Sequence, residues 1–136
     1  MTEKKYLETS EKKSSEEKAP SKAILIGVYT DKGQKEACEE HLEELERLAD
    51  TYGFVVAHKI PIFLRKFEAS TYLTKGKVEE AQALARAYEA DIVIFDDEIQ
   101  PSHQRNLEES FERTVMDRTE LILEGFGQRA QTKEAK

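Results

Sequence analysis

Three consecutive acids are the first residues in this sequence that could carry chemistry. Asp96, Asp97 and Glu98 directly follow the short apolar segment 92–95. Carboxylate oxygens are the ligands that Mg²⁺ prefers, so Asp96 and Asp97 are candidate metal ligands. A phospho-receiver domain would also need an acidic pair after its first strand and a lysine after a fifth strand, and neither is visible. The simpler interpretation is that these acids cap the helix starting at Pro101 and face water.

A second candidate is the basic segment Thr74-Lys75-Gly76-Lys77, which opens a predicted helix. Free backbone N–H groups at a helix start, together with Lys75 and Lys77, suit a phosphate or RNA contact. The segment is not a P-loop, because that motif needs two glycines five residues apart followed by Lys and Ser or Thr. A basic helix start without any ligand is the alternative interpretation.

The other reactive side chains show no catalytic pattern. The three histidines lie on separate predicted elements without metal-ligand spacing, and no serine lies in the Gly-x-Ser-x-Gly turn of hydrolases. The single cysteine, Cys38, cannot form an internal disulfide and is predicted to pack in the core. No catalytic residue is therefore assigned, and enzymatic activity of the chain stays open.

Apolar segments and helical patterns alternate along residues 22–130. Residues 23–29 are continuously apolar, which predicts a central parallel strand covered on both faces. Further strands are predicted from residue 54, at 91–95 and at 114–116. Helices are predicted at about 38–52 and 75–88, from 101, and from 117 or 118. This alternation predicts an α/β fold, a small three-layer domain with a mostly parallel four-stranded sheet.

Pro61 interrupts the second predicted strand. Because proline lacks an N–H for the ladder, Pro61 is expected to end this strand or place it at a sheet edge. Residues 60–74 are then predicted to be a long, mobile connection in which Arg65 and Lys66 stand among apolar residues. This connection is a candidate docking segment.

Composition and charge narrow the classes of protein. The 136 residues carry a net charge of −7, with 36% charged and 38% hydrophobic residues, which fits one water-soluble domain. The longest apolar runs are far shorter than the roughly 20 residues of a membrane span, and the N-terminus lacks a secretory signal, so a cytoplasmic location is expected. The negative charge repels phosphate backbones, so any RNA contact must be local. Residues 1–21 are predicted to be a disordered charged arm.

Three polar-rich motifs resemble the N-terminal domain of the HflX family of ribosome-associated GTPases. They are STYLTKGKVEE at 70–80, IFDDEIQPSHQRNLE at 94–108 and MDRTELILEGFGQRA at 116–130. Their order and spacing also agree with the family. The resemblance implies an HflX-type α/β domain at 22–130, followed at 131–136 by the start of a helical hairpin, with the chain ending before a G domain.

The resemblance also implies a function. The domain would be the ribosome-docking and regulatory part of a GTP-binding protein that associates with the large ribosomal subunit and its rRNA. Its own helical hairpin and G domain would be its neighbours, and GTP and Mg²⁺ would bind in that G domain, where GTP is hydrolysed. No cofactor is expected in the present chain. The motif residues implied in binding or in a structural network are Arg105, Asn106, Asp117 and Arg118.

Two alternatives stay open beside docking. Adenine-nucleotide binding has been credited to this region in relatives, so ATP or Mg²⁺ near Asp96, Asp97 and Asp117 would give the domain its own activity. Alternatively, the domain is a purely structural scaffold for the hairpin, and its motif residues form a polar network. Docking would use basic side chains, for which the candidates are Arg65, Lys66, Lys75, Lys77, Arg105, Arg118 and Arg129.

Some positions depart from the family pattern. Thr74 stands where the family usually has the first glycine of Gly-x-Gly-Lys, which removes one residue that would let a backbone approach a phosphate. Gln100 replaces the common serine before Pro101 and is a poorer helix cap. Gly125 and Gly127 replace better helix formers.

The last predicted helix is expected to bury one apolar stripe, formed by Ile122, Phe126 and Ala130. Because two glycines lie within it, each costing up to about 1 kcal/mol relative to Ala, this helix is expected to fray.

Overall fold

Four parallel strands form the sheet of this domain in the computed structural model, which describes residues 21–65 and 72–125. The strands are β1 (Lys22–Tyr29), β2 (Val55–Phe63), β3 (Ile92–Phe95) and β4 (Thr114–Asp117). Their spatial order is β2-β1-β3-β4, and every neighbouring pair is parallel. The predicted α/β class and the central place of the first strand are confirmed. The predicted hairpin start at 131–136 and all of the predicted arm except Ser21 lie outside the described residues.

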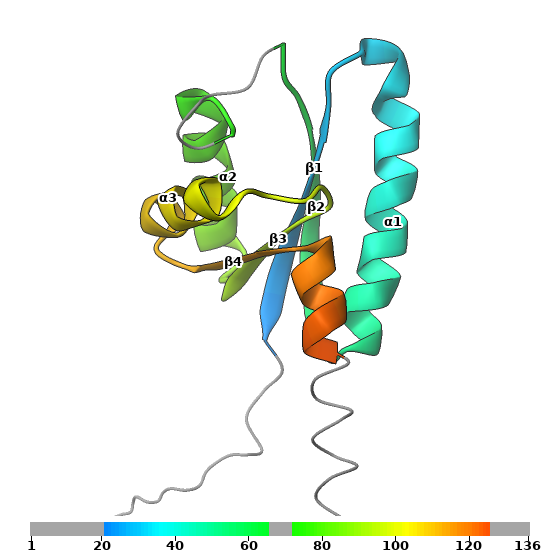
Figure 1. Cartoon of the computed structure of the whole chain (residues 1–136), viewed down its shortest axis with the longest axis vertical. Helices are drawn as coiled ribbons and strands as arrows, with labels where there is room; N and C mark the ends of the chain where they lie inside the picture. The colour runs from blue at the N-terminus through cyan, green and yellow to red at the C-terminus, as the bar shows by residue number, and fades with distance from the viewer. Residues whose placement is uncertain (1–20, 66–71, 126–136) are drawn as a thin grey trace, which may run out of the picture.

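Helices cover both faces of the sheet, as Figure 1 shows. The short 3-10 turn η1 (Lys32–Gln34) leads into α1 (Lys35–Thr51), which shares one face with a helix at residues 118–125. The opposite face carries α2 (Lys75–Ala87) and α3 (Pro101–Phe111). Alternate residues of β1 enter two separate cores: Leu25 packs beneath α1, and Ile24 packs toward α2 and α3. The three-layer prediction is therefore confirmed.

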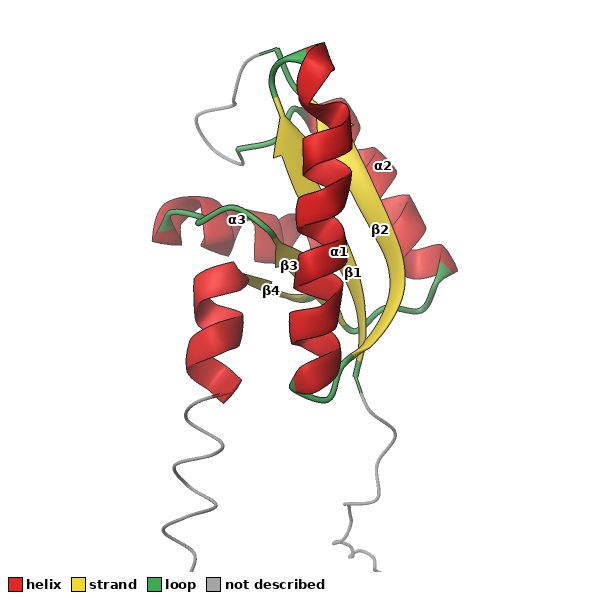
Figure 2. Ribbon diagram, turned by 90° about the vertical axis from the view of Figure 1, so that its right-hand side faces the viewer, coloured by secondary structure: helices red, strands yellow, loops and turns green. Residues whose placement is uncertain are grey.

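The first helix packs closely on the sheet because a glycine lies beneath it. The predicted inner face of α1 is buried, from Cys38 to Ala49, and Figure 2 shows the helix lying along β1 and β2. A Cβ at Gly27 would lie 2.9 Å from the sulfur of Cys38 and 3.0 Å from Cγ of Leu42. The helix ends at Thr51, and Gly53, with a φ of 96°, then turns the chain toward β2.

The second strand is longer than predicted. β2 lies at the sheet edge, as the proline prediction allowed, but it passes through Pro61 and pairs with β1 as far as Phe63. The prediction that the connection begins at residue 60 is therefore wrong, because Ile60–Phe63 continue the ladder. An edge strand tolerates a proline since only one of its sides pairs. Lys66 lies outside the described residues, and Arg65 is exposed.

The last helix begins at residue 118, as predicted, but its contacts differ from the prediction. Leu121 is the fully buried side chain, whereas Ile122 is only half-buried, and Phe126 and Ala130 lie outside the described residues. Gly125 is buried against the ring of Tyr52 at the end of α1, and an added Cβ would collide with that ring. This glycine allows two helices to approach closely.

We therefore expect Gly125→Ala to lower the free energy of unfolding by about 1–3 kcal/mol, the usual cost of overpacking. Urea denaturation of the variant measures this loss. Gly76→Ala is the matched control, because a Cβ at Gly76 meets no atom within 4 Å. Equal stability of wild type and Gly125→Ala would contradict the close packing of this helix on α1.

Candidate functional site

The polar motif residues gather at the carboxyl ends of the strands. In open parallel sheets, ligands bind at this edge, at the point where neighbouring strands lead to helices on opposite faces. Here β1 leads to α1 on one face, and its neighbour β3 leads to α3 on the other. Asp96 and Asp97 follow β3, and Asp117 and Arg118 stand at the end of the adjacent β4.

Asp117 holds two helix starts together. Its side chain is buried, with 6% of the residue's surface exposed. Oδ2 accepts a hydrogen bond from the backbone N–H of Ile99 at 2.9 Å, and Oδ1 accepts one from the N–H of Glu120 at 2.9 Å. The first bond fixes the turn before α3, and the second caps the last helix. Because both oxygens have donors, the carboxylate is satisfied although it is buried.

Arg118 ties the same helix start to β3 and α1. Its Nε and Nη2 donate to Oδ1 of Asp96 at 3.1 and 2.5 Å. Nη1 lies 3.6 Å from Oε1 of Glu44, and Nη2 donates to the carbonyl oxygen of His41 at 3.4 Å. One side chain thus spans the β3 end and the middle of α1.

Gln104 extends these contacts to α3. Its Nε2 donates to the carbonyl oxygen of Val115 at 2.7 Å and to Oε1 of Glu120 at 2.8 Å. Burial raises the pKa of Glu120, and the nearby charge of Asp117 also raises it, while the hydrogen bond from Gln104 opposes the shift. The charged form of Glu120 therefore weakens the folded state.

Tyr72 connects the segment before α2 to the acids after β3. Its hydroxyl donates to Oδ2 of Asp97 at 2.9 Å, and its ring packs edge-on against Phe95. Burial and the charge of Asp97 raise the pKa of Tyr72, so its hydroxyl remains a donor. The backbone of Tyr72 has a φ of 72°, a region that costs a non-glycine residue of order 1–3 kcal/mol. Surrounding contacts must offset that cost.

The candidate metal ligands are occupied by protein donors. Asp96 binds Arg118, Asp97 accepts from Tyr72, and Asp117 accepts from two backbone groups. Within the described ranges 21–65 and 72–125, no group of three or more His, Cys, Asp and Glu side chains could hold a metal. Burial raises the pKa of Cys38 to about 11, and the charges of Asp96 and Asp97 add to the effect.

The basic candidates lie elsewhere. Lys75 and Gly76 are exposed in the first turn of α2, where Oγ1 of Thr74 accepts from the N–H of Lys77 at 3.4 Å. Nζ of Lys77 lies 3.4 Å from Oε1 of Glu80. On α3, Arg105 is exposed and Asn106 is half-buried. The structure thus joins Asp96 to Arg118 but places the two lysines on a separate element.

Sequence reasoning missed Gln104, Glu120 and Tyr72. One signal was available, because Asp117 and Glu120 have the spacing of a capping box, in which an N-cap side chain precedes an acid by three residues. Gln104 and Tyr72 act across long stretches of chain, and no local pattern indicates their partners. None of the described helices has the length and hydropathy of a membrane span.

The strand order and the position of the polar site define the class of this protein. It is an open parallel α/β domain, and its strand order 2-1-3-4 is the one found in flavodoxin-like sheets. A family model described as "GTP-binding GTPase N-terminal" matches residues 39–127, and the chain belongs to this family. It is 43% identical over 120 residues to GTPase HflX of Chlamydia pneumoniae, an alignment that covers 88% of this chain and 25% of the relative. GTPase HflX of Alkalihalophilus pseudofirmus is also 43% identical, over 113 residues, with 83% and 26% covered.

These relatives confirm the resemblance to the HflX GTPases, and the chain spans about a quarter of their length. Solved structures show the same fold. A mutation variant of SsGBP superposes with a TM-score of 0.58 at 20% identity, covering 77% of this chain and 32% of that one. A complex of SsGBP with GDP gives 0.54 at 19% identity, covering 79% and 29%. Identities this low support the fold alone.

We expect Asp117→Asn to lower the free energy of unfolding by about 2–4 kcal/mol, because an amide nitrogen cannot accept from a backbone N–H. Chemical denaturation at neutral pH measures the loss. Asp91→Asn is the control, since Asp91 accepts from the N–H of Lys22 at 3.0 Å at an exposed position. A similar, small loss in both variants would show that burial of Asp117 does not matter.

Glu120→Gln should raise the free energy of unfolding at neutral pH. The folded-state pKa of Glu120 lies above its ordinary value. The folded chain therefore binds more protons than the unfolded chain between those two pKa values, and stability falls as the pH rises through that window. The advantage of the variant should disappear at a pH below the ordinary Glu pKa. Glu124→Gln, at an exposed site on the same helix, serves as control. An advantage that does not change with pH would contradict this assignment.

Proposed function

We propose that this chain is the N-terminal docking and regulatory domain of an HflX-type GTP-binding protein that associates with the large ribosomal subunit. The observation that carries the proposal is the division of charge at the carboxyl edge. The acids there bind protein donors and hold helices in place, whereas Lys75 and Arg65 remain exposed. GTP and Mg²⁺ would bind in the G domain of the full-length protein, in the cytoplasm.

Docking on rRNA would use the start of α2. Lys75 and Lys77 flank Gly76, whose φ is not positive and which has no neighbour that would exclude a side chain. A glycine in an exposed helical turn costs stability, so structure alone gives no reason for it. Its absence of a Cβ would let a phosphate approach the free N–H groups of the helix start. The net charge of −7 requires that such a contact be confined to this end.

Regulation would pass through the helix at 118–125. Asp117 and Arg118 fix its direction relative to α1, β3 and α3. A helix held by buried and partly buried polar contacts has few alternative orientations, so it could position a neighbouring GTPase domain. The purely structural alternative is part of the same proposal, because positioning a neighbour is how the domain would regulate it. A Mg²⁺ or ATP site is not proposed, since the acids involved already have partners.

Replacing Lys75 and Lys77 by alanine in the full-length protein should weaken co-sedimentation with large ribosomal subunits about tenfold or more and reduce its salt dependence, because phosphate contacts are lost. GTP hydrolysis without ribosomes should not change. Lys22→Ala/Arg86→Ala removes the same charge at the opposite end of the sheet and of α2 and should bind normally. Unchanged binding of the first variant, or an equal loss in the second, would contradict docking at this end.

A further inference from the structure

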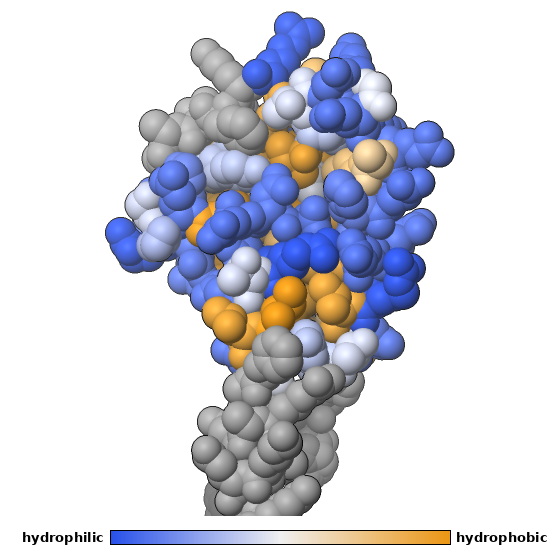
Figure 3. All heavy atoms as spheres, turned by 45° about the vertical axis from the view of Figure 1, so that its right-hand side comes forward, coloured by the Kyte–Doolittle hydropathy of each residue, from blue (hydrophilic) through white to orange (hydrophobic). Residues whose placement is uncertain are grey.

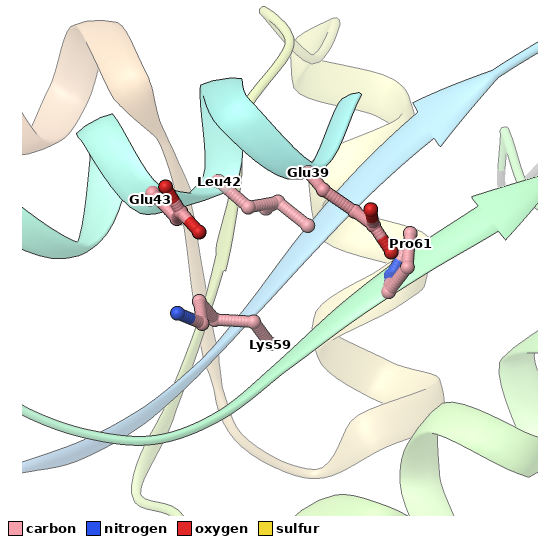
Figure 4. A pocket seen from close by; sticks show the side chains of 5 residues that line it. All are labelled: Glu39, Leu42, Glu43, Lys59 and Pro61. Carbon is pink, nitrogen blue, oxygen red and sulfur yellow. The ribbon is translucent and has the colours of Figure 1, made fainter. Parts of the chain in front are cut away.

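The hollow between α1 and β2 is part of an ordinary solvated surface. Its volume is about 230 Å³. Figure 4 shows the side chains that line it, which are Glu39, Leu42, Glu43, Lys59 and Pro61. Nζ of Lys59 lies 2.7 Å from Oε1 of Glu46, so the cation of the hollow is already paired. On the side of the molecule where α1 lies, the surface is mostly hydrophilic, as Figure 3 shows. The opposite layer of the domain, where α2 begins, is more informative.

The backbone of Tyr72 is strained in a place that helix geometry does not explain. Glu89 and Glu112 are the other described non-glycine residues with a positive φ. They follow the last turns of α2 and α3, where a left-handed residue is common. Tyr72, with a φ of 72°, instead precedes α2. Strain of this kind is concentrated in parts of proteins that clamp or switch. The contacts of Tyr72 therefore indicate what the strained residue does.

Side-chain contacts hold Tyr72 in this conformation. Its hydroxyl donates to Oδ2 of Asp97 at 2.9 Å, and the centroid of its ring lies 6.2 Å from that of Phe95 and 6.0 Å from that of His103. The next residue, Leu73, is fully buried in the core that α2 and α3 cover. A glycine would remove the strain but would make none of the ring and hydroxyl contacts. The conformation is therefore retained for the position that it gives the side chain.

The acceptor of this hydrogen bond belongs to the rigid part of the domain. The backbone N–H of Asp96 donates to the carbonyl oxygen of Ile26 at 2.9 Å, and the side chain of Asp96 binds Arg118. Asp97 is the next residue, so its position is fixed by the central strand and by the last helix. The hydroxyl of Tyr72 thus ties the segment before α2 to the sheet.

The first turn of α2 is weakly held by its own contacts. Oγ1 of Thr74 caps it at 3.4 Å from the N of Lys77, which is long for a hydrogen bond, and the turn contains no acid that would favour the helix dipole. Gly76 lowers the stability of a helix relative to alanine. The buried face of α2 consists of Val78 and two alanines, which bury little apolar area. The position of this turn therefore depends on the anchor at Tyr72.

Two opposing contributions of similar size act at this anchor. The hydrogen bond between Tyr72 and Asp97 is exposed to solvent, so its net contribution to stability is modest. The strain of a left-handed tyrosine costs about as much as one hydrogen bond and one aromatic contact contribute. Because the two contributions nearly cancel, loss of the hydrogen bond alone is enough to favour a relaxed backbone.

We propose that Tyr72 and Asp97 form a latch with two states, which sets the position of the first turn of α2. In the closed state, which the structure shows, the hydroxyl binds Asp97 and φ is positive. In the open state the hydrogen bond is broken, φ returns to negative values, and the turn that carries Lys75 moves relative to the sheet. The consequence for docking rests on the function proposed above, because a partner bound at Lys75 would select one of the two states. The latch itself needs no ribosome.

Removal of one hydroxyl tests the latch in the isotope-labelled chain. Tyr72→Phe keeps the ring but loses the bond to Asp97, so the ratio of open to closed molecules should rise about threefold to tenfold, the usual effect of one hydrogen bond. NMR relaxation dispersion at the amides of residues 73–75 measures this ratio. Tyr88→Phe is the matched control, because the hydroxyl of Tyr88 makes no hydrogen bond to the residues that the structure describes. No added exchange in Tyr72→Phe, or equal exchange in the two variants, would overturn the proposal.

Substitution of the acceptor distinguishes a latch from a general loss of stability. Asp97→Ala should open the turn as much as Tyr72→Phe does, whereas Asp97→Asn keeps an oxygen that can accept and should stay close to wild type. The double variant Tyr72→Phe/Asp97→Ala should open no further than either single variant, because all three lack the same hydrogen bond. Additive effects, or exchange that extends equally to the amides of β1, would mean that the whole domain loosens and would overturn the proposal.

Failure of the latch and failure of docking give different results. Dispersion that does not change in Tyr72→Phe overturns the latch and leaves docking at Lys75 intact. Unchanged ribosome binding of Lys75→Ala/Lys77→Ala overturns docking, whereas increased exchange in Tyr72→Phe would still support the latch.

Discussion

The carboxylate of Asp117 is a charge in the interior of the domain, and a buried charge is stable only if every oxygen has a donor. Its two donors are the N–H groups of Ile99 and Glu120, which belong to the starts of two different helices. The sheet alone does not determine how those helices leave it. Because the one side chain of Asp117 accepts hydrogen bonds from both helix starts, the direction of the last helix depends on the position of α3. A movement of either helix start would break a hydrogen bond to Asp117.

Arg118 carries the same constraint to the other face of the sheet. Its guanidinium joins Asp96, at the end of β3, to the middle of α1. Gly125 permits the last helix to approach Tyr52 at the end of α1, so the helix is held at both ends of its described length. Asp96 and Asp97, the acids that first suggested a metal site, therefore have partners within the protein. Among the candidate residues that the structure describes, Lys75 at the start of α2 remains exposed.

The sequence predicted the elements whose pattern is local. The apolar run of β1, the inner face of α1 and the start of α3 at Pro101 were all confirmed, because burial on two faces, helical periodicity and proline placement act over short distances. Less could be predicted where the outcome depends on a distant neighbour. Leu121 is buried in place of Ile122 because α1 lies beside the helix, and Gly125 is explained only by the ring of Tyr52.

The candidate site was predicted in part for the same reason. Asp96, Asp117 and Arg118 were identified from the motifs. Their spacing in the sequence did not indicate that Arg118 would bind Asp96, or that Asp117 would accept hydrogen bonds from the starts of two helices. Tyr72 is separated from Asp97 by 25 residues. Its positive φ is not indicated by the residue type or by its sequence neighbours. Polar contacts between distant segments follow from the completed fold, so their members appear in the sequence only as isolated polar residues.

Amide hydrogen exchange at Ile99 and Glu120, followed by NMR in wild type and Asp117→Asn, tests whether the carboxylate of Asp117 joins the two helix starts. If the carboxylate holds both helix starts, the two amides should exchange slowly in wild type and accelerate together in the variant, more than the amides of α1. If only one amide accelerates, or neither does, the two helices are positioned independently and Asp117 does not join them.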